Sequence, residues 1–305
     1  MSHFKILVIG DKVDEQLAPY DENKETEAYK VEDYDHAEKV AAARKFYNEN
    51  PRHRPEGGVD IANERALLGW YCQGEDIRWV HKGDGEWVSE EWSTYNPNSK
   101  WDYFTIGGRY NAWFKIKADA NPDDFHPSEA HWSEKFGNDA NHANASDKAM
   151  KRAIDFPAMI AARRAAAEAD WAKLSEATEG IEPPAYGWAE CLEKHGIDNI
   201  DAARKEWNTH PWNVEARNAG FWDPYEDFQM RAEDPRATYI ARAEDLAVTG
   251  FYAVLKDGEW IARGEMGWFG ISNDTVSETD WSSKVRELIE ELPEDTWLTN
   301  IDCHI

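Results

Sequence analysis

Cysteine is scarce in this sequence, and long apolar runs are missing. The 305 residues include three cysteines, Cys72, Cys191 and Cys303, which form no Cys-x-x-Cys motif and cannot all pair with one another. This argues against a disulfide framework and against a cysteine-based zinc site. No stretch approaches the roughly 18 consecutive apolar residues of a membrane helix, and the first residues lack the basic flank of a secretory signal. We therefore expect a cytoplasmic protein without a membrane segment.

Basic residues are also few. Lysine and arginine total 34 against 60 aspartate and glutamate residues, which gives a formal net charge of −26. A field of this sign repels nucleic acid and anionic membranes at long range, so direct nucleic-acid binding is not expected. Two interpretations of the charge stay open. It can simply keep a surface soluble, or it can mimic nucleic acid and occupy a basic groove on a host protein.

Tryptophan, in contrast, is abundant, with sixteen residues. Large aromatic side chains usually fill protein cores. Several of these tryptophans stand beside charged residues and glycine instead of within apolar runs: Trp92, Trp101, Trp132, Trp222 and Trp281. We expect some of them to line grooves or seams, where one or two can stack on a ligand.

The hydrophobic periodicity predicts an α+β fold. Strands are predicted over residues 3–10, 77–80, 86–89, 101–106, 110–117, 249–255, 259–263 and 296–305. Helices are predicted over residues 36–48, 60–72, 148–177, 187–195, 200–208 and 281–292. Asp35, Asp60 and Asp280 are the expected helix caps, and Ile61, Leu67 and Leu68 should face inward.

The order of these elements predicts one sheet that is interrupted by an insertion. N-terminal, central and C-terminal strands should form a mixed or antiparallel sheet, with residues 1–117 and 236–305 as the α+β core. Residues 118–235 are expected to form a mainly helical insertion or subdomain, of which 118–147 is polar and irregular.

Three segments carry a resemblance to known sequences. They are the start Met1-Ser-His-Phe-Lys-Ile-Leu-Val-Ile-Gly, the central Trp101-Asp-Tyr-Phe-Thr-Ile-Gly-Gly-Arg-Tyr, and the ending Leu292-Pro-Glu-Asp-Thr with Asp302-Cys-His-Ile. In these segments the chain resembles uncharacterised proteins of tailed bacteriophages and prophages. The resemblance does not extend to residues 118–235. It implies a phage origin and action in the bacterial host cytoplasm, but it supplies no activity and no functional residues.

The last strand carries the candidate catalytic residues. Asp302 and His304 are two residues apart, so an extended strand places both side chains on one face. A histidine beside a carboxylate can act as a general acid or base, or bind a metal. If the terminal strands pair, His3 lies near His304, and two histidines flanking a phosphate suit phosphodiester cleavage. Alternatively, all three residues are polar strand ends that face solvent.

The centre of the chain carries the candidate ligand-binding residues, Asp102, Tyr103, Gly107, Gly108 and Arg109. Adjacent glycines allow backbone N–H groups to approach a ligand closely, and an arginine beside them can bind a phosphate or carboxylate. The alternative is that the glycines build only a turn and that Arg109 pairs with a carboxylate such as Asp102.

A glycine-rich loop at 264–270 supplies one further ligand-binding candidate, Trp268. The loop lacks the ending of a phosphate-binding loop, but Trp268 can stack on a base or, alternatively, fill the core. His126, His131 and His142 match no metal-ligand spacing, so no metal site is predicted. No cofactor fingerprint or hydrolase motif is present either.

These observations support three hypotheses of function. In the first, the protein binds, and can cleave, a nucleotide-like anionic ligand, with a role in counter-defence or nucleotide metabolism. In the second, it is an acidic inhibitor that docks on a basic host protein without chemistry. In the third, it is a structural or virion-associated protein. The sequence favours the first hypothesis and leaves open whether any reaction is catalysed.

Overall fold

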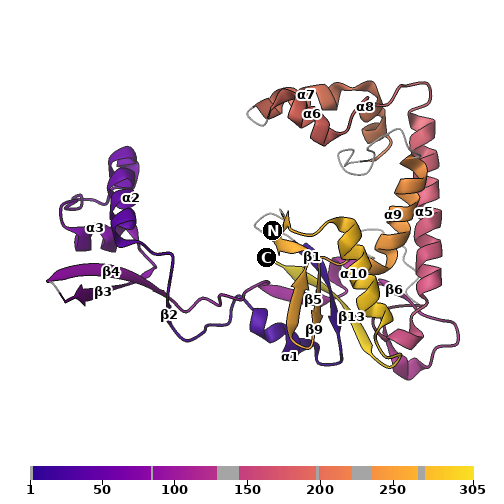
Figure 1. Cartoon of the computed structure of the whole chain (residues 1–305), viewed down its shortest axis with the longest axis horizontal. Coiled ribbons are helices and arrows are strands. Elements are labelled where there is room, and N and C mark those ends of the chain that lie inside the picture. Colours follow the sequence, from indigo (N-terminus) through magenta and orange to yellow (C-terminus); the bar gives the residue numbers. More distant parts are fainter. Residues whose placement is uncertain (1–2, 84, 129–143, 197–198, 222–234, 267–271) are drawn as a thin grey trace. The chain divides into compact units, whose positions relative to one another are not determined.

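The computed structural model describes residues 3–83, 85–128, 144–196, 199–221, 235–266 and 272–305. The chain divides into two compact units, of which the larger comprises Met1–Leu17 with Tyr103–Ile305 and the smaller comprises Ala18–Asp102. Both combine helices with strands, which confirms the predicted α+β class (Figure 1). A search of the described helices found none with the length and apolar character needed to cross a bilayer.

The larger unit is built on a mixed sheet, eight-stranded in the described part of the chain. The strand order is β10 (Glu259–Ala262), β9 (Ala253–Lys256), β1 (His3–Ile9), β13 (Trp297–His304), β8 (Ala145–Met150) and β6 (Phe114–Lys115), with β5 (Tyr103–Ile106) on β13 and β7 (Phe125–Pro127) on β8. Strand β1 runs antiparallel to β13 and parallel to β9. The first and last strands of the chain are therefore neighbours in the sheet centre.

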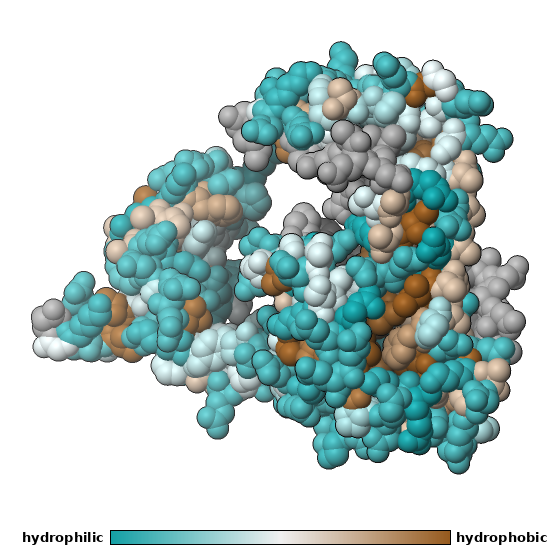
Figure 2. Space-filling model, turned by 45° about the vertical axis from the view of Figure 1, so that its right-hand side comes forward, coloured by the Kyte–Doolittle hydropathy of each residue, from teal (hydrophilic) through white to brown (hydrophobic). Residues whose placement is uncertain are grey.

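Helices and two further strands complete the larger unit. They are α1 (Val13–Leu17), α5 (Phe156–Ala177), α6 (Trp188–His195), α7 (Ile200–Thr209), α8 (Pro211–Asn218), α9 (Pro235–Thr249), α10 (Glu278–Glu290), β11 (Gly264–Met266) and β12 (Ser272–Asp274). The main core joins one sheet face to α9 and α10, through buried residues such as Leu7, Leu298, Val248 and Val285. In Figure 2 an apolar band lies over α5 and α9, on an otherwise largely hydrophilic face.

The smaller unit packs two helices on a three-stranded sheet. Its elements are α2 (His36–Glu49), α3 (Glu64–Tyr71) and the strands β2 (Tyr29–Lys30), β4 (Glu86–Ser93) and β3 (Asp76–Lys82), in the order β2-β4-β3. The core contains Val40, Leu67 and Leu68. As predicted, Asp35 caps α2, because its carboxylate accepts the backbone N–H of Glu38.

The turn sequences between the predicted strands 77–80 and 86–89, and between 249–255 and 259–263, predict two hairpins, and the structure shows both, as strand pairs β3–β4 and β9–β10. In the second, Asp257 and Gly258 both adopt positive φ, 53° and 81°, which matches a two-residue turn whose twist suits the flanking strands. Two predicted caps are wrong. Asn63 caps α3 and Ser277 caps α10, each through its side-chain oxygen, and Ile61 is exposed because it precedes α3.

The predicted helix 148–177 begins later than expected. Residues up to Met150 instead form β8, which pairs with Trp297–Thr299 of β13. The helix starts after Asp155, whose carboxylate accepts the backbone N–H of Ala158. The segment Ala-Ser-Asp-Lys-Ala-Met has no alternating apolar pattern, so it carries no strand signal. Backbone hydrogen bonds to β13 hold it in the sheet instead.

The sequence pattern at Gly107–Gly108 predicts either a hairpin or a sharp bend, and the structure shows the bend. Strand β5 pairs with β13 and not with the segment that follows Gly108. That segment forms a 3-10 turn over Gly108–Tyr110 and returns as the two-residue strand β6. At the other end of the helical stretch, Thr249 belongs to α9, so the predicted strand 249–255 is confined to Ala253–Lys256.

The division into residues 1–117 with 236–305 and residues 118–235 stays a prediction beside the two compact units of the structure. Residues 18–102 separate from the sheet core, whereas residues 118–235 belong to the same unit as the sheet. The reason is visible in the strand pairing, since β7 and β8 lie within the expected insertion and extend the main sheet.

Candidate functional site

Four chemically active side chains meet at one end of the main sheet. His3 on β1 lies opposite His304 on β13, and His304 lies opposite Tyr103 on β5. Residues directly opposite each other on neighbouring strands share a face. Asp302 precedes His304 by two residues and therefore lies on this face too. The structure thus brings together His3, Asp302 and His304, as the strand pattern predicted, and places beside them Tyr103, one of the predicted ligand-binding residues.

Hydrogen bonds join three of these residues in a row. Nδ1 of His3 lies 2.9 Å from Oδ1 of Asp302, and Nε2 of His3 lies 3.3 Å from the Tyr103 hydroxyl. A carboxylate beside Nδ1 favours the tautomer that carries its proton there. In that tautomer Nε2 is an acceptor, and the Tyr103 hydroxyl donates to it. The arrangement is a carboxylate–imidazole–phenol relay.

The relay runs from the interior to the surface. Asp302 is 4% exposed and the His3 side chain 9%, whereas Tyr103 is 48% exposed. A buried carboxylate can orient the imidazole without competition from water. Tyr103 is the member that a ligand in solution can reach first.

His304 fixes the position of the tyrosine ring. The two rings stack with centroids 4.5 Å apart and an interplanar angle of 19°, and His304 meets His3 edge-on at 5.0 Å. Since His304 is buried, it acts here as a rigid platform, and the ring that faces solvent is Tyr103.

The bend Gly107–Arg109, here called the glycine–arginine bend, packs against the carboxylate of Asp302. The backbone N–H of Arg109 donates to Oδ2 of Asp302 over 2.9 Å. A Cβ on Gly108 would lie 2.4 Å from the same oxygen, and Gly108 has a φ of +51°. Only glycine fits this close approach in this conformation. Gly107 and Gly108 are therefore placed against internal carboxylates, as a turn, and do not form an open cradle for a ligand.

The Arg109 side chain, in contrast, is exposed. In the described part of the chain, its guanidinium forms no ion pair with a carboxylate. In a protein with a net charge of −26, such an arginine beside the relay supplies positive charge where an anion can be held.

A second buried carboxylate, missed by the sequence analysis, supports the same bend. Asp147 on β8 accepts four hydrogen bonds, from Ala112 N (2.9 Å), Trp113 N (3.1 Å), Ser128 Oγ (2.6 Å) and Asn300 Nδ2 (2.8 Å). Asp147 lies at the end of a polar stretch that was expected to be irregular. No motif or spacing distinguishes it from the other acidic residues of this stretch.

Lys5, also missed, is buried beside the relay and opposite Asp302 in the strand pairing. Its Nζ lies 2.8 Å above the centre of the Trp113 ring and 5.1 Å from that of Phe251. Burial among these rings, and next the charge of Arg163, lowers the pKa of Lys5 to about 6. The amine is thus neutral at pH 7. A lysine inside the apolar run of β1 was the available sequence signal.

This buried amine makes stability depend on pH. Between about pH 6 and 10.5 the unfolded chain carries a proton on Lys5 that the folded chain lacks. The free energy of unfolding should therefore rise with pH across this window, by at most about 1.4 kcal/mol per pH unit. In urea titrations, Lys5→Met is expected to be more stable than the unmodified chain at pH 7 and to show a smaller gain between pH 7 and pH 9. An equal gain in both proteins would contradict the assignment.

Two further sequence candidates are Asp102 and Trp268. Asp102 belongs to the smaller unit, where its carbonyl accepts a hydrogen bond from Asn23, and Trp268 lies outside the described residues. No known family model matches this sequence, and comparisons with curated proteins and with solved structures found no match. The chemistry of the site therefore has to be argued from its own residues.

Proposed function

We propose that this chain binds a small, nucleotide-like anion at the sheet end that carries His3, Tyr103 and Asp302, and that His3 acts on it as a general acid or base. The hydrogen-bonded row from buried carboxylate to exposed phenol carries this proposal. A histidine oriented by a carboxylate is the arrangement that acid–base catalysis uses most often. A purely structural strand end needs neither the buried aspartate nor the exposed tyrosine.

Each group has a role in the proposed chemistry. Asp302 holds the His3 ring and stabilises its protonated form. Nε2 of His3 takes a proton from the hydroxyl or water that displaces the Tyr103 hydroxyl and attacks the phosphorus, and it returns this proton to the oxygen that leaves as the old P–O bond breaks. The exposed ring of Tyr103 offers a face on which a base can stack. The Arg109 guanidinium supplies charge-assisted hydrogen bonds to a phosphate.

The biological setting follows from the resemblance to tailed-phage proteins at both ends of the chain and in the central strands. Together with the site, it supports an accessory protein that acts in the bacterial cytoplasm. Binding or cleaving a nucleotide-type signal there is a means of counter-defence.

A thermal-shift screen of mononucleotides, dinucleotides and cyclic dinucleotides tests this proposal. At least one compound should raise the melting temperature of the unmodified chain by a few degrees when present well above its Kd. The rise should vanish in Arg109→Ala and persist in Arg204→Ala, which removes an exposed positive charge on α7. If no compound stabilises the chain, or if both variants respond equally, the proposal is wrong.

A second candidate function rests on the net charge of −26. An acidic inhibitor would dock on a basic host protein through long-range attraction and would need no acid–base chemistry. It predicts capture of a basic partner that weakens steeply between low and high salt, and that is unaffected by His3→Gln. The two functions are thus separable in one set of variants.

A further inference from the structure

A second cluster of reactive side chains lies on the helix pair α6 and α7. Cys191 and His195 are four residues apart on α6, so they lie on one face, one turn apart. Glu206 projects from α7 toward them, and its Oε2 lies 2.7 Å from Nε2 of His195. The Cys191 Sγ lies 3.7 Å from the carbonyl oxygen of Ala203, one turn before Glu206.

Each of the three residues Cys191, His195 and Glu206 offers one ligand atom, and these three atoms lie within 4.8 Å of one another. The cysteine is buried, whereas the histidine and the glutamate are partly accessible. An ion between them would therefore be covered on one side by the helix pair and be reachable from the other.

From this geometry we infer a Zn²⁺ site formed by Cys191, His195 and Glu206. Thiolate, imidazole and carboxylate are the three protein ligand types that zinc binds, and this mixture favours zinc over magnesium or calcium, which prefer oxygen ligands alone. Three protein ligands leave the fourth tetrahedral position to water. On binding, the Cys191 S–H bond breaks, the proton passes to solvent, and a Zn–S bond forms.

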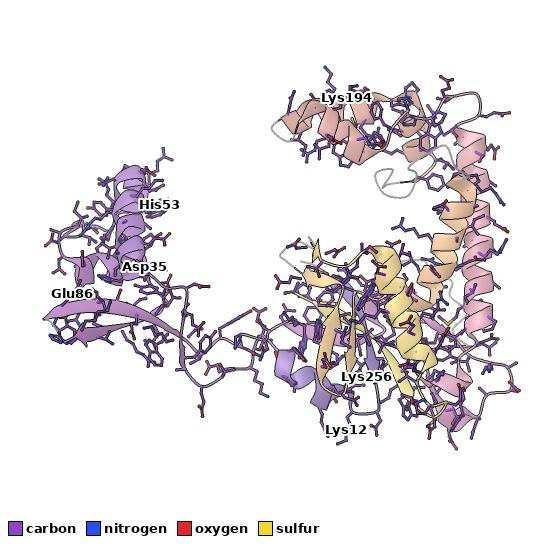
Figure 3. The ribbon with its side chains drawn as sticks, viewed as in Figure 1. Lys12, Asp35, His53, Glu86, Lys194 and Lys256 are labelled. Carbon is purple, nitrogen blue, oxygen red and sulfur yellow. The ribbon has the colours of Figure 1, made fainter. Side chains whose placement is uncertain are left out.

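The cluster already stabilises positive charge at this position. The Lys194 ammonium contacts both oxygens of Glu206, at 2.7 and 3.0 Å, and the Tyr186 hydroxyl donates to the same carboxylate. Lys194, labelled in Figure 3, has a side chain that is 52% exposed. It can therefore turn into solvent when a divalent ion takes its place on Glu206.

Because the helix pair α6 and α7 is small, a bound metal would stabilise its fold. Its buried cluster contains Cys191, Ala203 and Trp207, with Tyr186, Trp188 and Leu192 packed around it. A core of this size contributes little stability by itself, and small elements often rely on a bound metal. The zinc site is independent of the proposed function, since its residues lie on different elements from His3, Tyr103 and Asp302.

Titration with Co²⁺, a spectroscopic substitute for zinc, tests the inference on the full-length chain after treatment with a chelator. We expect one equivalent to produce the charge-transfer absorption of a cobalt–thiolate bond and the intense visible bands of tetrahedral cobalt, and Zn²⁺ to abolish both. Cys191→Ala should remove the charge-transfer absorption. Glu206→Gln, which preserves the size of the side chain, should weaken Co²⁺ binding at least tenfold while the far-ultraviolet circular dichroism stays unchanged.

Two variants serve as controls. Cys72→Ala removes a buried thiol of the smaller unit, and Glu193→Gln removes an exposed carboxylate from α6 itself; neither should change the titration. The absence of a thiolate band in the unmodified chain, its persistence in Cys191→Ala, or equal affinity in Glu206→Gln and Glu193→Gln would each overturn the inference.

Discussion

Replacing Gly108 with alanine is expected to lower the free energy of unfolding of the larger unit by roughly 3 kcal/mol or more. The added Cβ would lie 2.4 Å from Oδ2 and 2.5 Å from Cβ of Asp302, closer than any tolerated contact, and the residue has a φ of +51°. Relief of the clash requires the bend to move away from the carboxylate, which then loses the Arg109 N–H. Urea unfolding followed by tryptophan fluorescence measures the loss.

Gly258 provides the matched control for this substitution. It also has a positive φ, +81°, but a Cβ there meets no atom within 4 Å. Gly258→Ala should therefore cost only the conformational penalty, on the order of 1 kcal/mol. The difference between the two variants isolates the close approach to Asp302, and similar losses in both would refute a tight fit at Gly108.

Replacing Asp147 with alanine is expected to cost about 3 to 5 kcal/mol. The carboxylate is buried and accepts four hydrogen bonds, two from backbone N–H groups, one from Ser128 and one from Asn300. Alanine removes the shared acceptor of these four donors, of which the Asn300 amide keeps a second one, the Tyr110 carbonyl. Asp147→Asn keeps the shape and part of the acceptor capacity, so its loss should be smaller.

Asp119 is a suitable control because it is exposed on the loop after β6. Asp119→Ala should change the free energy of unfolding by no more than about 0.5 kcal/mol. Chemical denaturation of the three variants gives the comparison. If Asp147→Ala were as mild as Asp119→Ala, the buried network around the bend would not be a determinant of the fold.

The catalytic candidates could be predicted because their spacing is regular. His3, Asp302 and His304 interrupt apolar strands with the two-residue period of one sheet face, and pairing of the terminal strands brings that face together. Tyr103 follows from the same reasoning only once β5 is known to pair with β13. From the sequence alone, the pairing partner of β5 expected for a hairpin was the segment after Gly108.

Residues whose role depends on tertiary contacts could not be predicted. Asp147 stands in Ala-Ser-Asp-Lys-Ala-Met, where the strand is defined by its hydrogen bonds to β13 and not by an apolar pattern. The Cys191–His195 pair has a recognisable helical spacing, but the third ligand, Glu206, comes from another helix. The spacing of His126, His131 and His142, in contrast, predicted no metal site.

The boundaries of the smaller unit could not be predicted from the sequence either. Residues 18–102 join the sheet core directly at Leu17 and Tyr103, without a run of proline, glycine or serine to mark a boundary. What separates them is that their strands pair only with one another, and pairing partners are not encoded in local composition.

The proposal that a ligand binds at the row Asp302–His3–Tyr103 rests on the hydrogen bonds that join these residues. It is tested most directly by nuclear magnetic resonance of the histidine rings, with His3 and His304 assigned from His3→Gln and His304→Gln, during titration with the compound that gives the largest thermal shift. We expect the His3 and His304 ring signals to move together and to saturate with the same Kd, while the signal of His36 in the smaller unit stays in place. Stationary His3 and His304 signals under saturating compound would contradict the proposal.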